Sequence, residues 1–99
     1  MITLRARFHE QARLEFLEAV AYYEAIQVGL GERFLQSVKS AVHLAASLPF
    51  AGAAHTLGTR RIFLKKFPFA VVYRVDPDEI LIFAVAHFKR KPGYWQKRK

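Results

Sequence analysis

The sequence predicts an α+β domain in which a helical hairpin packs on a small, mainly antiparallel four-stranded sheet. Three observations support this prediction. Apolar and polar residues alternate over Met1–Phe8, apolar residues recur at helical spacing between residues 10 and 48, and two β-branched and aromatic runs follow at Phe69–Val75 and Ile80–Phe88. The expected order is β-α-α-β-β-β. We expect residues 1–99 to form a single domain, because a chain of this length can bury one hydrophobic core.

The N-terminal strand and two amphipathic helices are read from the spacing of apolar residues. The strand is expected to turn Ile2, Leu4, Ala6 and Phe8 toward the core. A helix follows from Glu10 to about Gln27, and its inner stripe comprises Ala12, Phe16, Ala19, Val20 and Tyr23. Its glutamates Glu15, Glu18 and Glu24 are expected to face water. Gly29-Leu30-Gly31 ends this helix, because glycine readily takes the left-handed conformation. The second helix ends at Pro49, and its inner stripe comprises Phe34, Val38, Ala41, Ala45 and Leu48.

The second half of the chain holds the other three expected strands. A loop at Phe50–Leu57 leads to the second strand, where Ile62 and Leu64 alternate with Arg61, Phe63 and Lys65. Asp76-Pro77-Asp78-Glu79 predicts a tight turn between the last two strands, because proline presets φ and aspartate bonds nearby amides. Both of these strands are apolar at almost every residue. We therefore expect cover on both faces, or one face that receives a partner.

Charge is distributed unevenly along the chain, whose formal net charge is +8. Five glutamates and one base lie between Glu10 and Glu32. By contrast, Arg33–Val75 holds seven bases and Ile80–Lys99 holds six, and neither segment holds an acid. This pattern predicts an acidic-to-neutral helical side and a strongly basic sheet-and-tail side. The basic side suits nucleic acid or an acidic protein segment, and the alternative is that its charge merely aids solubility.

Composition excludes several classes of protein. The chain has no cysteine, so disulfides and thiolate chemistry are excluded, as suits the cytosol. The four histidines, at 9, 43, 55 and 87, lack the spacing of metal ligands, and we expect neither a metal nor a cofactor. No run reaches the ~18 apolar residues of a membrane span, and there is no signal peptide. These features predict a soluble, cytoplasmic protein without a membrane partner.

Several short motifs occur in an order shared with a known family. They are Ala12-x3-Phe16-x6-Tyr23, then Gly31-Glu32-Arg33-Phe34, then Pro49-x2-Gly52, and finally the strand pair FPFAVVYRV and ILIFAVAH before a basic segment. Together with the order of elements, they resemble the RelE/ParE superfamily of toxins from type II toxin–antitoxin systems. The resemblance implies a growth-inhibiting toxin, of the kind associated with plasmid stabilisation. It also implies a cognate antitoxin, whose often acidic C-terminal part folds over the toxin, and assembly with it into higher hetero-oligomers.

The resemblance leaves two activities open. Some members of the superfamily cut messenger RNA on the ribosome, and others poison DNA gyrase. RNA cleavage needs a proton acceptor, a proton donor and cations for the phosphate. The resemblance assigns these tasks, if the chain is a ribonuclease, to Arg61, Lys65, His87, Arg90 and Tyr94. However, Ala70 or Val71 stands where many ribonuclease members carry arginine, and Phe63 stands where a second cation is expected.

These departures favour the ParE-like branch, which acts by binding gyrase. A ribosome-dependent mRNA endoribonuclease is the alternative, and a non-toxic basic binding module is the third reading. Whether the chain is an enzyme therefore stays open. Candidate residues for binding the target or the antitoxin are Arg61, Lys65, Arg74, Lys89, Arg90 and Tyr94.

Several further residues carry individual expectations. Arg74 either lies on a binding face or pairs with a helix glutamate. His87 is either an acid–base residue or a hydrogen-bonded structural one. We expect Trp95 to pack over the sheet rather than to stack on a nucleotide base. The last three residues, 97–99, are expected to be solvated.

Overall fold

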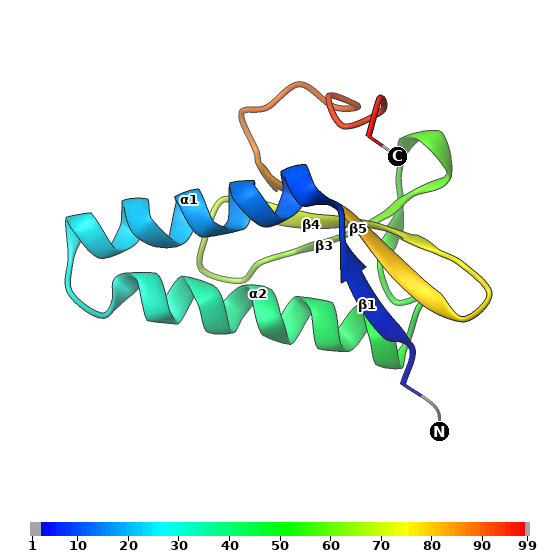
Figure 1. The fold of residues 1–99 in the computed structure, drawn as a ribbon, viewed down its shortest axis with the longest axis horizontal. Coiled ribbons are helices and arrows are strands. Elements are labelled where there is room, and N and C mark those ends of the chain that lie inside the picture. The colour runs from blue at the N-terminus through cyan, green and yellow to red at the C-terminus, as the bar shows by residue number, and fades with distance from the viewer. Residues whose placement is uncertain (1–2, 99) are drawn as a thin grey trace.

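The structure, a computed structural model, describes residues 3–98, so Ile2 of the expected inward strand face and the terminal Lys99 lie outside the described residues. Its α+β class is as predicted (Figure 1). The elements are β1 (Arg5–Phe8), α1 (Glu10–Ile26), α2 (Leu30–Ser47), β2 (Ala53–Ala54), β3 (Arg60–Phe63), β4 (Phe69–Val75) and β5 (Glu79–His87), with a 3₁₀ turn at Thr56–Gly58. The order therefore matches the prediction with one added strand, the two-residue β2.

The strands form one sheet in the order β1-β5-β4-β3-β2. β1 runs parallel to β5, and the other neighbours are antiparallel. The expected turn joins β4 to β5, and the Asp76 amide donates to the Glu79 carbonyl at 2.9 Å. β2 pairs only with Arg60 and Arg61. It lies in the expected loop, because two alanines carry no periodic pattern by which a strand can be recognised.

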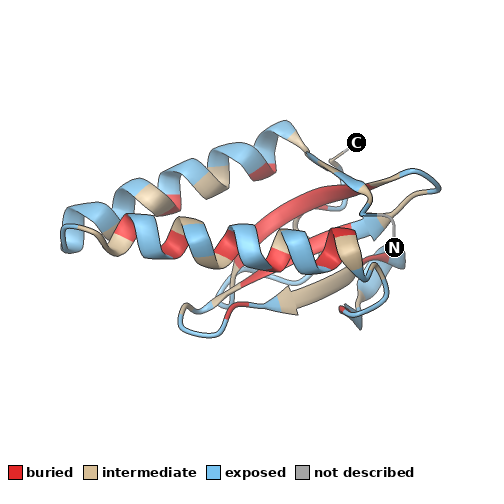
Figure 2. Ribbon diagram, turned by 90° about the horizontal axis from the view of Figure 1, so that it is seen from below, coloured by how far each residue is buried: buried red, intermediate tan, exposed pale blue. Residues whose placement is uncertain are grey.

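The helical hairpin covers one face of the sheet (Figures 1 and 2). Gly29 begins α2 with φ of 90°, a conformation that glycine adopts without strain. A side chain at Gly31 would bring its Cβ within 2.6 Å of the Val20 carbonyl oxygen, so the two helices meet closely there. The carboxylate of Glu24, which was expected to face water, accepts hydrogen bonds from the amides of Gly29 and Gly31. It thereby satisfies amide groups that the start of a helix leaves unpaired.

The main core lies between this hairpin and the sheet. Phe34 and Val38 are fully buried, and they belong to one apolar cluster with Val71, Tyr73 and Ile82. Three residues of α1 pack against this cluster while partly buried, namely Phe16, Val20 and Tyr23. The predicted inner faces of both helices are therefore confirmed except at Leu48, which is 49% exposed because α2 ends one residue before it.

A smaller core lies on the other face of the sheet. Phe83 is an extra residue in β5, because Val72 pairs with Ala84 and the adjacent Tyr73 pairs with Ile82. Such a bulge places two consecutive side chains on one face, and both Phe83 and Ala84 belong to this second cluster. The C-terminal segment, residues 88–98, covers the cluster with Trp95, which is 3% exposed. The expected packing of Trp95 is confirmed.

Candidate functional site

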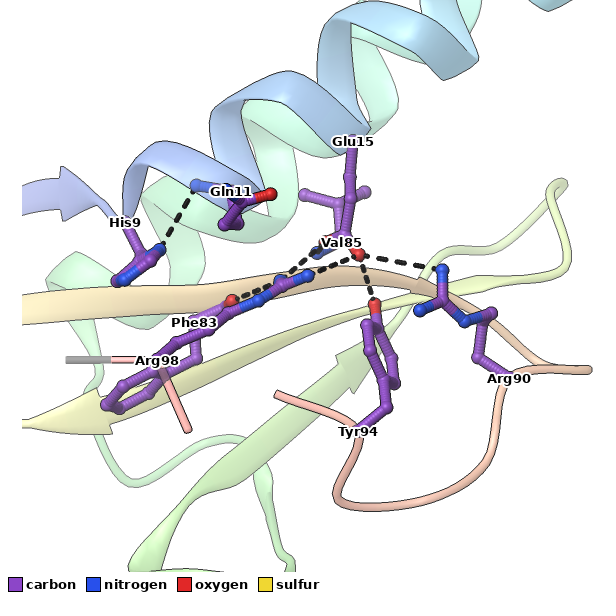
Figure 3. A network of polar contacts seen from close by, with 8 residues as sticks. All are labelled: His9, Gln11, Glu15, Phe83, Val85, Arg90, Tyr94 and Arg98. Atoms are coloured by element: carbon purple, nitrogen blue, oxygen red, sulfur yellow. Dashed lines mark hydrogen bonds and ion pairs between the residues drawn. The ribbon is translucent and has the colours of Figure 1, made fainter. Parts of the chain in front are cut away.

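The carboxylate of Glu15 on α1 binds several side chains of the C-terminal segment (Figure 3). The Tyr94 hydroxyl donates to Glu15 Oε2 at 2.6 Å, and Arg98 donates from both terminal nitrogens to the two carboxylate oxygens at 2.9 and 3.0 Å. Arg90 lies farther away, with Nη1 3.9 Å from Oε2. Bidentate pairing of a guanidinium with a carboxylate is strong and fixes orientation. Glu15 therefore ties residues 90–98 to the first helix.

The same two charged residues also satisfy backbone groups of β5. β1 pairs with β5 only at Glu79–Ile82. Beyond this pairing, the Val85 amide donates to Glu15 Oε1 at 3.2 Å and the Phe83 carbonyl accepts from Arg98 Nη1 at 2.9 Å. Unpaired strand edges otherwise attract other strands. Glu15 and Arg98 thus provide hydrogen-bond partners for backbone groups in the part of β5 that β1 does not cover.

Tyr94 is held in its protonated form. Burial, followed by the hydrogen bond to Glu15, raises the pKa of Tyr94 well above its usual range. Its ring is also covered by a cation, because the Arg90 guanidinium carbon lies 3.8 Å from the ring centroid. The hydroxyl is therefore committed to Glu15 as a donor, and at neutral pH it is a poor proton acceptor.

A hollow of about 270 Å³ lies between β3, β5 and the C-terminal segment. We call it the basic hollow. It brings together four of the sequence-predicted residues, Arg61, His87, Arg90 and Tyr94. Its remaining wall includes His55, Phe63, Ala70, Val72, Phe88 and Trp95. Among residues 3–98, no aspartate or glutamate lines it, so the hollow suits an anionic group.

Arg61 is the central cation of the basic hollow. Its guanidinium lies over the Phe63 ring at 4.8 Å, and its buried Nε has no hydrogen-bond partner among residues 3–98. Burial of His55, together with the charge of Arg61, lowers the pKa of that imidazole. At neutral pH His55 therefore adds little charge of its own. Of the ring nitrogens of His87, Nδ1 accepts from the Lys89 amide at 3.0 Å, which is the structural role considered for it.

The structure separates the other predicted residues from the basic hollow. Lys65 lies past the end of β3, beside α2, so it does not share a face with Arg61 as expected. Arg74 pairs with Asp76 at 2.7 Å and not with a helix glutamate, because Asp76 lies two residues away at the end of the same strand. Lys89 is exposed and lies between His87 and Arg90.

Sequence reasoning missed two residues of the network. Glu15 was expected to face water, but its carboxylate turns toward β5 and the C-terminal segment. Arg98 was expected to be solvated, but its side chain is 14% exposed and bound to Glu15. Helical spacing alone could not have found Glu15, since the residues that bind it lie 70 or more positions away. The usable signal was charge: Ile80–Lys99 holds six bases and no acid, so an acid from another part of the chain was needed beside it.

The described part of the chain was also searched for metal and membrane features. Among residues 3–98, no group of three or more His, Cys, Asp or Glu side chains is placed to hold a metal ion. No helix in the same range is long and apolar enough to cross a membrane.

Comparisons with known proteins agree with this architecture. The family model described as "ParE toxin of type II toxin-antitoxin system, parDE" matches residues 6–92. No curated protein matches the chain. A solved structure titled "Chromosomal ParDE TA system from P. aeruginosa" is similar at a TM-score of 0.68 with 20% sequence identity, over 86% of this chain and 96% of that one. At this identity the solved structure supports the fold alone, whereas the family model spans most of the sequence. The chain therefore belongs to the ParE toxin family of type II toxin–antitoxin systems.

Proposed function

We propose that this toxin acts in the cytoplasm by binding DNA gyrase and that a cognate antitoxin neutralises it. One observation supports binding over catalysis: the hydroxyl of Tyr94 donates to Glu15 and its ring is covered by Arg90. The tyrosine hydroxyl that a ribonuclease could use for proton transfer is thereby engaged inside the fold. The same contacts hold the C-terminal segment in a fixed shape, which suits recognition of a protein surface.

The basic hollow and the C-terminal segment form the proposed target surface. Arg61, Lys89 and Arg90 supply its positive charge, and Phe63 and Phe88 are exposed aromatic residues that pack on one another at 5.4 Å. Aromatic and arginine side chains dominate the binding energy of many interfaces. Loss of Arg61 alone would leave the other side chains of this surface in place, whereas a ribonuclease would lose most of its rate with one catalytic group.

The experiment is expression of the chain alone, with DNA breaks and the DNA-damage response scored against cleavage of translated mRNA. We expect DNA damage with little or no mRNA cleavage. Toxicity should survive Arg61→Ala better than replacement of residues 89–95 by a Gly/Ser segment of equal length. Both variants must first be shown to fold, by their thermal unfolding. Efficient cleavage at a fixed codon position, abolished by Arg61→Ala or Arg90→Ala, would establish the ribonuclease instead.

The ribonuclease is retained as the second candidate for one reason. Arg61, His87 and Arg90 do line the same hollow, so two cations and an imidazole lie near one another. Lys65 is absent from that set. Ala70, one of the two positions where the resemblance expects an arginine, supplies apolar surface to the hollow instead. Removing one preorganised donor typically slows such a reaction by ~100 to 1000-fold. Any cleavage by this chain is therefore expected to be slow.

Binding of the antitoxin is expected to depend on charge. An acidic antitoxin segment would be steered by the basic sheet-and-tail side, so its association rate should fall markedly as salt rises. Its apolar contacts should keep the complex tight at the same salt concentrations. Stopped-flow association at increasing salt tests this, and an association rate indifferent to salt would contradict it.

A further inference from the structure

Two buried hydrogen-bond donors have no acceptor within the fold, and the residues that carry them both line the basic hollow. They are Nε of Arg61 and Nε1 of Trp95, which find no partner among residues 3–98. Buried polar groups in folded proteins are nearly always hydrogen-bonded, so each orphaned donor calls for a specific explanation. Trp95 is only 3% exposed, so bulk water does not readily reach its indole. The two donors therefore indicate a ligand that brings its own acceptor atoms.

The two guanidinium groups of the hollow are also poorly neutralised. Arg61 takes part in none of the ion pairs that residues 3–98 form. Arg90 lies 3.9 Å from Glu15 Oε2, and its side chain is 53% exposed (Figure 3). Glu15 is held much more closely by Arg98, so Arg90 can bind a ligand without leaving that carboxylate unpaired. Two guanidinium groups at one site suit a ligand that carries two negative charges, because each offers a planar fork of donors.

His87 adds a donor whose tautomer is fixed by the backbone. Its Nδ1 accepts from the Lys89 amide at 3.0 Å, so that nitrogen carries no proton. The proton of the imidazole therefore lies on Nε2, which makes Nε2 a hydrogen-bond donor. His87 lines the hollow together with Arg61, Arg90 and Trp95, and within residues 3–98 no carboxylate lines it beside them. Four residues of the hollow thus offer N–H groups to an anion.

Aromatic rings form much of the remaining wall. Phe63 and Phe88 are exposed and pack edge to face at 5.4 Å, and the His55 and Trp95 rings lie 5.2 Å apart. Aromatic faces accept the flat ring of any nucleobase. The hollow, at about 270 Å³, is also far larger than the space that one ordered water occupies. A phosphate bound by the N–H groups can therefore carry a flat organic group, although the donors themselves do not require one.

We propose that the basic hollow binds a phosphate dianion, supplied by inorganic phosphate or by the terminal phosphate of a mononucleotide. Its oxygens accept hydrogen bonds from Arg61, Arg90 and Trp95, with Nε2 of His87 as a further donor. Such a phosphate carries about two negative charges and three strong acceptor oxygens, which match this set of donors.

The ligand differs from the phosphate that a ribonuclease would bind. A phosphodiester within a nucleic-acid strand has a single negative charge and fewer free oxygens, so it would leave part of the donor set unpaired. The proposal rests on the donors of the hollow and not on gyrase as the target. Because Arg61 and Arg90 belong to the proposed target surface, a bound phosphate would occupy part of that surface.

Trp95 supplies a reporter at the site, because it is the one tryptophan of the chain. The full-length ¹⁵N-labelled protein is titrated with inorganic phosphate, with adenosine 5′-monophosphate and with a dinucleoside monophosphate, in which the phosphate is an internal diester. About 0.15 M salt screens weak attraction to the rest of the basic surface. The indole N–H signal and the tryptophan fluorescence are recorded.

We expect the dianionic ligands to shift the indole N–H signal in a saturable manner. They should bind at least about tenfold more tightly than the diester. Tighter binding of adenosine monophosphate than of inorganic phosphate would identify a nucleotide as the source. Equal or tighter binding of inorganic phosphate would identify the free anion.

Variants of the two arginines test the charged donors. Arg61→Gln and Arg90→Gln should each weaken phosphate binding by about tenfold or more. Arg61→Lys keeps the charge but lacks the planar fork and the Nε donor, so it should recover only part of the affinity. Arg90→Gln changes an exposed side chain, so it remains informative if Arg61→Gln unfolds. Lys39→Gln removes one positive charge from an exposed residue of α2 outside the hollow, and this matched control should bind as the wild type does.

A third variant tests the indole donor. Trp95→Phe keeps an aromatic ring in the second core but removes Nε1, and it should weaken binding by about threefold to tenfold. Its binding is followed from the backbone amide signals of Arg61 and His87. Thermal unfolding shows whether each variant is folded before its affinity is compared.

Three results would overturn the proposal. One is the absence of a saturable change in the indole signal at millimolar concentrations of both dianionic ligands. Another is binding of the diester as tight as that of the dianions, which would assign the hollow to a phosphate within a strand and favour the ribonuclease. The third is unchanged affinity in Arg61→Gln and Arg90→Gln, which would place the ligand elsewhere. The titrations use the isolated chain, so they give the same answer whether or not gyrase is its target.

Discussion

The two faces of the sheet are closed by different physical means. On one face, two long helices contribute a continuous apolar layer around Phe34 and Val38. On the other face, a short irregular segment contributes Trp95, and the charged contacts of Glu15 hold that segment in place. The first closure is driven by apolar area removed from water. The second depends on a few directional contacts, so loss of one contact should release much of that cover.

The largest expected effect is on the helical face. Phe34→Ala removes a fully buried ring that packs on Tyr23, Phe67 and Phe69. We expect the free energy of unfolding to fall by ~3 to 5 kcal/mol, because a cavity is left in a close-packed core. Urea denaturation measures it. Phe63→Ala is the matched control, since that ring is 49% exposed. A loss below ~1 kcal/mol for Phe34→Ala would mean that this face does not depend on packing as described.

The second prediction concerns only the face of the sheet that the C-terminal segment covers. Glu15→Gln removes the charge that pairs with Arg98 and weakens the acceptor of the Tyr94 hydroxyl. We expect a loss of ~1 to 3 kcal/mol, together with a red shift of Trp95 fluorescence as the segment loosens. Far-UV circular dichroism should stay unchanged, because the helical face is intact. Glu18→Gln, an exposed neighbour on α1, is the control and should leave the fluorescence as in the wild type.

The third prediction uses alkaline pH to measure how much the Tyr94 hydroxyl contributes to the free energy of unfolding. The pKa of Tyr94 is raised in the folded state by burial and by Glu15, so its contribution is complete below about pH 10. Above that pH Tyr94 loses its proton in the unfolded chain but keeps it in the folded chain. The free energy of unfolding therefore falls as pH rises. The slope from Tyr94 should stay below the ~1.4 kcal/mol per pH unit of a full proton, because the side chain is partly exposed.

Tyr94→Phe should flatten this alkaline decline, whereas Tyr22→Phe should not, because Tyr22 is 64% exposed. Chemical denaturation between pH 9 and 12 gives the comparison. Spectrophotometric titration near 295 nm should also show one fewer late-ionising tyrosine in Tyr94→Phe. If both variants decline with the same slope as the wild type, the hydroxyl of Tyr94 is not held by Glu15.

The smallest effect is expected for an ordinary surface ion pair. Arg74 pairs with Asp76 at 2.7 Å, but the arginine side chain is 45% exposed. Arg74→Gln should therefore change the free energy of unfolding by less than ~1 kcal/mol. Thermal unfolding beside Glu15→Gln makes the contrast direct. Equal losses in the two variants would remove the distinction drawn here between the Glu15 network and an exposed salt bridge.

The sequence was sufficient where structure follows from local pattern. Residues such as Phe34 and Val71 repeat at helical or strand spacing, and their burial follows from that spacing and from the need to cover both apolar stripes. The helix ends and the turn at Asp76–Glu79 were also predictable, since glycine and proline fix them locally.

The candidate site was only partly predictable because its contacts join distant parts of the chain. Arg61 and Tyr94 were placed near one another by the family resemblance, and they do line one hollow. The position of Lys65 was not predicted correctly. The prediction assumed that the strand continues past Phe63, but β3 ends there. Glu15 was misplaced for a different reason. One side of α1 faces the sheet and another faces the C-terminal segment. The spacing of apolar residues predicts only the first of these sides, because the contacts of the second are polar.

The parallel pairing of β1 with β5 sets the order in which the molecule can assemble. Arg5–Phe8 pair with Glu79–Ile82, so β1 acquires its partner only after both helices and the three intervening strands have been made. The helical hairpin likewise emerges before every strand that it covers except β1. Contacts of such long sequence separation form slowly, because a large loop must close first. A ribosome therefore carries a chain with exposed apolar helices, and without the proposed target surface, until residues beyond β5 have emerged. The basic hollow can therefore form only after β5 and the segment that follows it have been made.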